Sequence, residues 1–257
     1  MAWRGLVRSA TGTRHQKQQQ PCQDYGVCLM LDKVAVGAVA DGAGSAALAE
    51  MGAKLAVDRV MRFLESSNRV LSRKHRLEKA FTEIEARQVF GRATEHAIAA
   101  LERYAAENNC NLSDLACTLL IFVATPHWVA SMQIGDGFIL VHPDGSDYQL
   151  LCQPQKGEYA NETAFITSPQ ALDEMQVTVL EGEQQFVCVA TDAIERVAIQ
   201  LRDWTPFPPF FHKLEEYLQE TENPEQDDAY LVDFLESERL SERTDDDKTL
   251  LLCLYEA

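Results

Sequence analysis

Short apolar runs separated by polar turns mark several segments of the chain as β-strands. Residues 26–31 and 34–40 are two such runs, with Asp32 and Lys33 between them, and they predict a β-hairpin. The second run has no polar residue, which is typical of a strand buried on both faces. Further strands are predicted at residues 118–124, 128–134, 138–142, 177–180, 186–190 and 250–255.

Helical periodicity marks the stretches between these strands. Apolar residues recur three and four positions apart in residues 46–64 and 78–108, which predicts two long amphipathic helices. Two further helices are predicted at residues 210–221 and 228–238. Residues 12–24 are polar and rich in glutamine, and residues 150–168 contain Pro154 and Gly157, so both stretches are interpreted as loops.

The strands and helices occupy the whole chain without an internal repeat or a long linker of biased composition. We therefore expect a single domain over residues 1–257. Because the strands follow one another in the middle of the chain, with the long helices to either side, the pattern indicates an α+β fold built on antiparallel strands.

Composition narrows the classes of function that remain. The formal net charge of −17 argues against a nucleic-acid partner, because phosphate backbones require basic surfaces. The seven cysteines include no C-x-x-C pair, which predicts reduced thiols and no cysteine-rich zinc site. No apolar run approaches the roughly 18 residues that span a bilayer, and the first residues do not resemble a secretory signal. We expect a cytoplasmic protein with no membrane partner.

Four predicted strands end or begin beside an aspartate: Asp41, Asp136, Asp192 and Asp246. One interpretation is turn chemistry, since aspartate and glycine both favour turns. The other is that the four carboxylates converge at one edge of a sheet. Converging carboxylates repel one another unless hard cations neutralise them, and clusters of oxygen ligands suit Mg²⁺ or Mn²⁺.

The segments that carry these aspartates resemble, in the same order, the conserved motifs of the protein phosphatase 2C family. Residues 36–45 are similar to its V-x-D-G-x-G-G motif, and Cys117-Thr118 with Gly135-Asp136-Gly137 is similar to its G-T-T and G-D-S pair. Residues 187–192 resemble the L-A-S/T-D-G motif, and residues 246–249 resemble the terminal D-N-x-T motif. The resemblance covers residues 12–255.

This resemblance implies both a fold and an activity. The fold would be two packed antiparallel β-sheets flanked by α-helices, a four-layer αββα sandwich. The activity would be that of a protein serine/threonine phosphatase, which hydrolyses phosphomonoesters by attack of a metal-activated water at a binuclear Mn²⁺ or Mg²⁺ centre. The implied substrate is a phosphoprotein carrying phosphoserine or phosphothreonine, and we expect a monomer.

The resemblance also implies a set of metal ligands. Asp41 would bridge two metal ions, and the backbone carbonyl of Gly42 would bind one of them. Asp192 and Asp246 would complete the other ion. Asp136, together with Asp192, would hold a third and looser ion.

Other site residues are implied less directly, and some depart from the family pattern. Asp24, in a Gln-Asp pair, would orient metal-bound water. Glutamines fill the stretch that usually carries a phosphate-binding arginine, and Arg14, His15 and Lys17 are the possible substitutes, with Arg14 the phosphate-binding candidate. His15 is either a catalytic candidate or an ordinary surface residue. Ala43 stands where a proposed general acid is common. Asp247 replaces the usual Asn, and its added charge would either tighten metal binding or be solvated.

A flap segment is implied at residues 157–163, which resemble the flap of the bacterial branch of the family. Tyr159 and Asn161 are its most chemically capable members. A polar loop beside a metal site is a natural place to select among phosphoproteins. The other interpretation is a passive surface loop.

Two alternative functions remain open on the sequence. The first is a phosphatase-like regulatory binding module whose catalysis is impaired. The second is a dinucleotide-binding protein, because the apolar run 34–40 precedes Gly42-x-Gly44 and a predicted helix. The second alternative requires alternating strands and helices, which the rest of the chain does not offer.

Overall fold

The computed structural model describes residues 2–31, 33–67, 71, 77–153, 163–224, 226 and 228–256. Ten of the strands in these residues form two five-stranded sheets, and every pairing in them is antiparallel. The first sheet has the order β2(Asp24–Leu31), β3(Val34–Asp41), β4(Leu119–Thr125), β5(Trp128–Ile134), β8(Gln176–Glu181). The second has the order β1(Ala2–Ala10), β12(Lys248–Glu256), β9(Gln184–Ala190), β6(Phe138–Pro143), β7(Gln149–Leu150).

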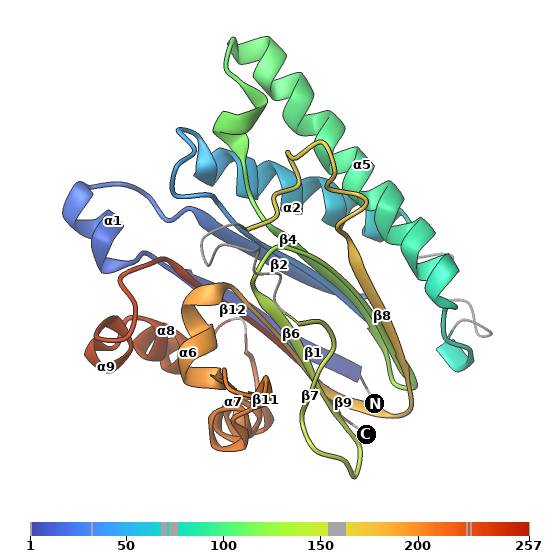
Figure 1. Cartoon of the computed structure of the whole chain (residues 1–257). Helices are drawn as coiled ribbons and strands as arrows, with labels where there is room; N and C mark the ends of the chain where they lie inside the picture. The colour runs from blue at the N-terminus through green and yellow to red at the C-terminus, as the bar shows by residue number, and fades with distance from the viewer. Residues whose placement is uncertain are drawn as a thin grey trace.

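Helices cover both outer faces of the pair of sheets (Figure 1). The first sheet is covered by α2(Ala49–Ser66) and α5(Glu83–Asn108). A turn of 3₁₀-helix, η1(Leu112–Leu115), follows α5. The second sheet is covered by α6(Glu195–Ala198), α7(Pro208–Glu220), α8(Ala229–Leu235) and α9(Glu238–Ser241). The remaining elements are α1(Thr13–Gln18), η2(Asp192–Ile194), and a short hairpin of β10(Ile199–Gln200) and β11(Thr205–Pro206).

Alternation along the central strands explains why four layers form. In β3, Val34 and Val36 pack into the core beneath α2 and α5, whereas Ala35 and Val39 pack between the two sheets. In β12, Leu250, Leu252 and Leu254 face the helices on the other side, and Leu251 and Cys253 face the neighbouring sheet. Strands buried on both faces read as continuous apolar runs, so the prediction made for residues 34–40 is confirmed, as is the αββα sandwich.

The all-antiparallel sheets also contradict the dinucleotide-binding alternative. That fold needs parallel strands joined by crossover helices, whereas β3 lies between two antiparallel neighbours, β2 and β4. The glycines after Asp41 therefore do not belong to a βαβ unit.

The sequence prediction missed several elements, among them β1 and α1, and misplaced some ends. The edge strand β1 was not predicted, and α1 lies where residues 12–24 were interpreted as a loop. The helix expected at residues 78–108 begins at Glu83, because Thr82 and Glu85 form a capping box there. The first long helix begins at Ala49 rather than at residue 46, and β12 begins at Lys248 rather than at residue 250.

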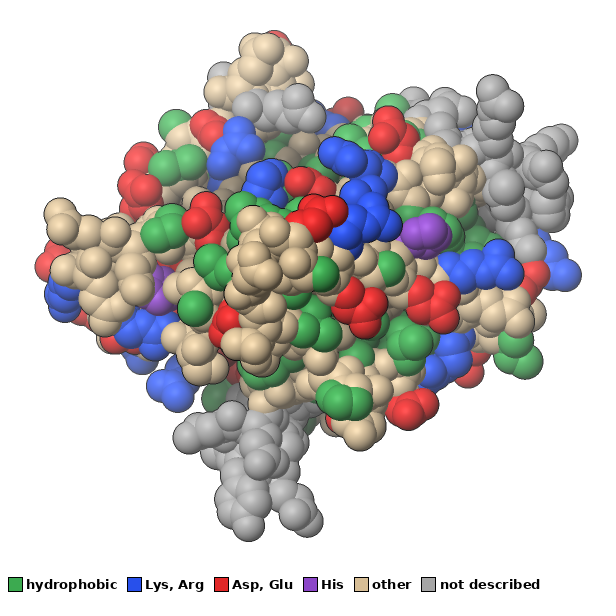
Figure 2. Space-filling model, turned by 90° about the horizontal axis from the view of Figure 1, so that it is seen from above, with side chains coloured by type: hydrophobic (Ala, Val, Ile, Leu, Met, Phe, Trp, Pro, Cys, Tyr) green, Lys and Arg blue, Asp and Glu red, His purple; other side chains and the backbone are tan. Residues whose placement is uncertain are grey.

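The outer surface above α2 and α5 carries interspersed acidic, basic and apolar side chains (Figure 2). Among the described residues, no helix combines the length and the apolar character needed to cross a bilayer.

Candidate active site

Five aspartates lie where strands of the two sheets begin or end at the same rim. Asp24 opens β2 and pairs with Asp41, the last residue of β3. Asp136 lies between β5 and β6, Asp192 follows β9, and Asp246 precedes β12. In the second sheet three strands reach this rim at the same level, because Ala190 of β9 pairs with Phe138 of β6 on one side and with Leu250 of β12 on the other.

The first Asp-Gly segment is fixed by backbone contacts with neighbouring strands. The Asp41 N–H donates to the Thr118 hydroxyl at 2.9 Å, and the Thr118 N–H donates to the Asp41 carbonyl at 2.8 Å. The next N–H, that of Gly42, donates to the Gln23 carbonyl at 3.1 Å. A Cβ on Gly42 would lie 2.7 Å from the carbonyl oxygen of Ala49, so the start of α2 leaves no room for a side chain.

The turn that presents Asp136 depends on a glycine and a buried amide. Gly135 has a φ of 116°, which side-chain-bearing residues rarely adopt. The Gln133 amide donates to the carbonyls of Gly135 and Gly137 at 3.0 and 2.7 Å and so spans the turn. The Asp136 carboxylate accepts a hydrogen bond from the Thr163 hydroxyl at 2.7 Å.

The carboxylates lie close enough to affect one another's ionisation. Burial raises the pKa of Asp41 well above its usual value, and the charges of four other aspartates raise it further. In decreasing order of effect these are Asp24, Asp192, Asp246 and Asp136. Like charges that share a site raise each other's pKa. The predicted convergence is therefore present, and the interpretation as independent turn residues does not account for it.

Asp24 lies deepest in this cluster and has one oxygen without a partner. Its side chain is 5% exposed, and its Oδ2 accepts a hydrogen bond from the Thr191 hydroxyl at 2.8 Å. Among the described residues, no group donates to its Oδ1. Burial raises the pKa of Asp24 to about 8, the Thr191 hydrogen bond opposes this rise, and the charge of Asp247 adds to it. A buried carboxylate oxygen with no donor is where a cation, or a water bound to one, fits.

A metal centre therefore fits the residues present. Hard divalent cations take carboxylate and carbonyl oxygens, and the cluster offers carboxylates from both sheets. The guanidinium of Arg14 contacts one of these carboxylates, with Nη2 2.8 Å from Asp246 Oδ1. A guanidinium on Asp246 does not neutralise the carboxylates around Asp41, whose pKa they raise.

The chain is similar to known proteins over nearly its full length. A model of the protein phosphatase 2C family matches residues 11–236. The chain belongs to this family. Its relatives include serine/threonine-protein phosphatase 3 of Escherichia coli, which is 34% identical over 280 aligned residues, with 99% of each chain covered.

Solved structures of family phosphatases share the fold. The serine/threonine phosphatase Stp1 of Staphylococcus aureus superposes with a TM-score of 0.63 and 14% identity, covering 100% of this chain and 96% of that one. The Mycobacterium tuberculosis phosphatase PstP/Ppp has the same TM-score with 13% identity and complete coverage of both chains. At this level of identity the likeness establishes the fold alone.

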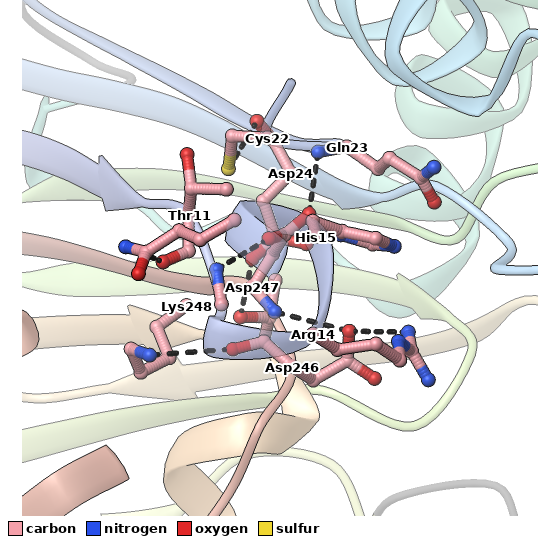
Figure 3. Close-up of polar contacts among 12 residues, drawn as sticks. Thr11, Arg14, His15, Cys22, Gln23, Asp24, Asp246, Asp247 and Lys248 are labelled. Atoms are coloured by element: carbon pink, nitrogen blue, oxygen red, sulfur yellow. Dashed lines mark hydrogen bonds and ion pairs between the residues drawn. The ribbon is translucent and has the colours of Figure 1, made fainter. Parts of the chain in front are cut away.

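The family resemblance implied Arg14 and His15 less directly than the aspartates, and both residues lie in α1. Arg14 faces Asp246, and a Cβ on Gly44 would lie 3.3 Å from its Nη2, so the guanidinium lies between the Asp41–Ser45 segment and β12. His15 is 3% exposed, which rules out the surface interpretation. Its Nδ1 lies 2.8 Å from Asp247 Oδ2 (Figure 3).

Asp247 is likewise buried, at 3% exposure, so the interpretation of a solvated charge was wrong. His15, Asp246 and Asp247 offer ligand atoms within 4.8 Å of one another, a spacing that would suit a metal ion. The Asp247 oxygens, however, already accept from His15 and from the backbone N–H groups of Gly12 and Gln23. These donors occupy the positions that a cation would take.

The sequence prediction missed the residues that support the aspartates. Two aspartates accept hydrogen bonds from hydroxyl groups, Asp24 from Thr191 and Asp136 from Thr163, and the Gln133 amide holds the turn around Asp136. Hydroxyl and amide side chains are common in loops and strands, so these supporting roles cannot be recognised from the sequence. Tyr159 and Asn161 of the flap lie outside the described residues.

Proposed function

We propose that this member of the family is a protein serine/threonine phosphatase that depends on Mn²⁺ or Mg²⁺. The observation that carries the proposal is the group of five aspartates at the shared rim of the two sheets, whose mutual effect is a raised pKa of Asp41. Such a cluster opposes its own ionisation, so it is suited to binding cations rather than to stabilising the fold. When bound, two such ions supply an activated water nucleophile and neutralise charge on the phosphoryl group.

Each aspartate has a proposed role. Asp41 and the Gly42 carbonyl, with Asp192 and Asp246, would hold the two core ions. Asp136 would hold a third, weaker ion. The orientation of Asp136 is limited by its hydrogen bond from Thr163, which joins it to the end of the flap segment.

Two further residues have proposed roles around the ions. Asp24 would orient water, since its Oδ2 is fixed by Thr191 while its Oδ1 has no donor among the described residues. Arg14 would bind a phosphate oxygen, because a guanidinium matches the geometry of phosphate oxygens. In the structure the Arg14 guanidinium contacts Asp246 through Nη2, and the Arg14 side chain is 38% exposed, so other guanidinium donors can meet a ligand.

The substrate class follows from the relatives. The Escherichia coli and Staphylococcus aureus proteins are named as serine/threonine phosphatases, and we infer the same class of phosphoprotein for this chain. The alternative of a catalytically impaired binding module is not favoured, because every aspartate expected to bind metal lies at the shared rim.

The test compares three preparations of the purified protein: metal-stripped with EDTA, reloaded with Mn²⁺, and reloaded with Mg²⁺. We expect hydrolysis of p-nitrophenyl phosphate and of a phosphoserine peptide only after reloading, and slower hydrolysis of a matched phosphotyrosine peptide. Equal activity in EDTA would refute metal dependence. Absence of activity with either ion, in a protein that binds them, would favour the binding module.

A further inference from the structure

The short helix α1 is attached to the far end of the chain by one buried carboxylate. Asp247 Oδ1 accepts from the Gly12 N–H at 2.7 Å, and its Oδ2 accepts from the Gln23 N–H at 2.6 Å and from His15 Nδ1 at 2.8 Å. The three donors are the residue before α1, a residue within it, and the residue before β2. One side chain thus fixes both ends and the middle of the segment 12–23.

The backbone at the start of this segment packs closely against the residues that precede β12. A Cβ on Gly12 would lie 2.3 Å from the Asp245 carbonyl oxygen and from the Asp246 carbonyl carbon, so the backbone of Gly12 lies directly against this strand entrance. The Arg14 N–H also donates to the Asp245 carbonyl at 3.0 Å. Because a carboxylate only accepts, His15 carries its proton on Nδ1, and Asp247 accepts from all three donors.

The arrangement determines where Arg14 lies. Arg14 precedes His15, and its Nη2 contacts Asp246, the residue before Asp247 (Figure 3). The other end of the segment, Gln23, accepts a hydrogen bond from the Gly42 N–H at 3.1 Å. The segment 12–23 therefore joins both sides of the carboxylate cluster.

We propose that Asp247 and His15 are positioning residues that hold Arg14 beside the carboxylate cluster for binding of the substrate phosphate. We call the four residues Gly12, His15, Gln23 and Asp247, with their three hydrogen bonds, the α1 clasp. The role of Arg14 in this inference rests on the proposed phosphatase function. The clasp itself does not, and it can be tested separately.

The first experiment measures the clasp without catalysis. In Asp247→Asn the side chain keeps its size, but an amide offers one acceptor where the carboxylate offers two, so at least one of the three donors loses its partner. We expect the amides of residues 11–24 to exchange with deuterium faster in this variant, and those of β12 to exchange at the wild-type rate. Gln16→Ala is the matched control, because Gln16 is exposed on α1 and its side chain donates to the Thr11 carbonyl rather than to Asp247. Unchanged exchange in Asp247→Asn would overturn the clasp.

The second experiment measures positioning. We expect Asp247→Asn and His15→Phe each to lower kcat/KM for a phosphoserine peptide about ten- to hundredfold, as misplaced binding groups do. In the Arg14→Ala background the same changes should have little further effect, because their effect passes through Arg14. His15→Asn, whose amide can donate from the position of Nδ1, should restore most of the loss.

Three outcomes would overturn the positioning role. One is an additive loss in the Arg14→Ala background, and another is no loss of kcat/KM in either single variant. The third is the loss of one bound Mn²⁺ in calorimetry of Asp247→Asn, which would make His15, Asp246 and Asp247 a metal site. A wild-type protein without phosphatase activity would overturn the proposed function and with it the role of Arg14, while deuterium exchange would still decide whether the clasp exists.

Discussion

Replacement of Asp24 by asparagine should stabilise the metal-free protein at neutral pH. Asp24 is buried, with a pKa raised to about 8 from an ordinary value of 3.8. The folded state therefore holds a proton on this group that the unfolded chain has released, so stability falls as pH rises from about 4 to about 8. At 1.36 kcal/mol per pKa unit, the cost at pH 7.5 is at most about 5 kcal/mol.

Asparagine removes this cost but introduces a smaller one. Its amide oxygen can accept the Thr191 hydrogen bond, while its NH₂ group takes the place of Oδ1, which has no partner among the described residues. An unsatisfied buried donor costs about 1–3 kcal/mol. The expected net gain is at most about 2–4 kcal/mol at pH 7.5, or roughly 4–16 °C in Tm for a chain of this size. At pH 5 the gain should vanish, because the pH is then close to the ordinary pKa of 3.8 and the wild type loses little stability by keeping Asp24 protonated.

The assay is thermal unfolding, followed by circular dichroism, of the two proteins in EDTA between pH 5 and pH 8.5. Asp233→Asn is the matched control: it removes the same charge from an exposed position on α8, and it should leave Tm nearly unchanged. Saturating Mn²⁺ should reverse the order of the two proteins, because bound cations stabilise the wild-type carboxylate. A Tm for Asp24→Asn that does not exceed the wild-type value at pH 8, or an excess that does not change with pH, would refute this reasoning.

Two further predictions separate the roles of the remaining aspartates. Asp192→Asn should lower turnover by several orders of magnitude, because it removes a proposed metal ligand, and it should not lower Tm in EDTA, because it also removes a repelling charge. Near wild-type turnover in the folded variant would exclude a ligand role, and Asp233→Asn again serves as the control. Asp136→Ala should lower turnover yet leave two Mn²⁺ ions bound, because Asp136 is the proposed ligand of a third, weaker ion. Loss of all tight Mn²⁺ binding in calorimetry would instead make Asp136 a ligand of the two core ions.

The sequence predicted the elements that are buried on both faces better than those at an edge. Residues 34–40 are a continuous apolar run because both faces of β3 are covered. The strand β1 was missed because it lies at the edge of its sheet and carries Arg4 and Arg8. Arg4 donates to the carbonyls of Gln219 and Thr221, contacts far along the chain that a local pattern does not encode.

The convergence of the site could be predicted, whereas its supports could not. Aspartates at strand ends are visible because carboxylates are rare in strands, and antiparallel pairing brings those ends to one rim. α1 was interpreted as a loop because its glutamines and Lys17 show no apolar face. Its one buried residue, His15, is held by Asp247, which lies 232 positions later in the chain.

Two departures from the family pattern are connected through α1. The sequence has glutamines where a phosphate-binding arginine is usual, and it has Asp247 where asparagine is usual. In the structure the candidate substitute Arg14 lies on the segment that Asp247 contacts at three points. A carboxylate can accept all three hydrogen bonds, whereas an asparagine cannot, because its NH₂ group would meet N–H donors. The proposed positioning role predicts that the acidic residue and Arg14 occur together. In relatives with asparagine at this position, we expect the phosphate-binding cation to lie elsewhere in the N-terminal segment, held by other contacts.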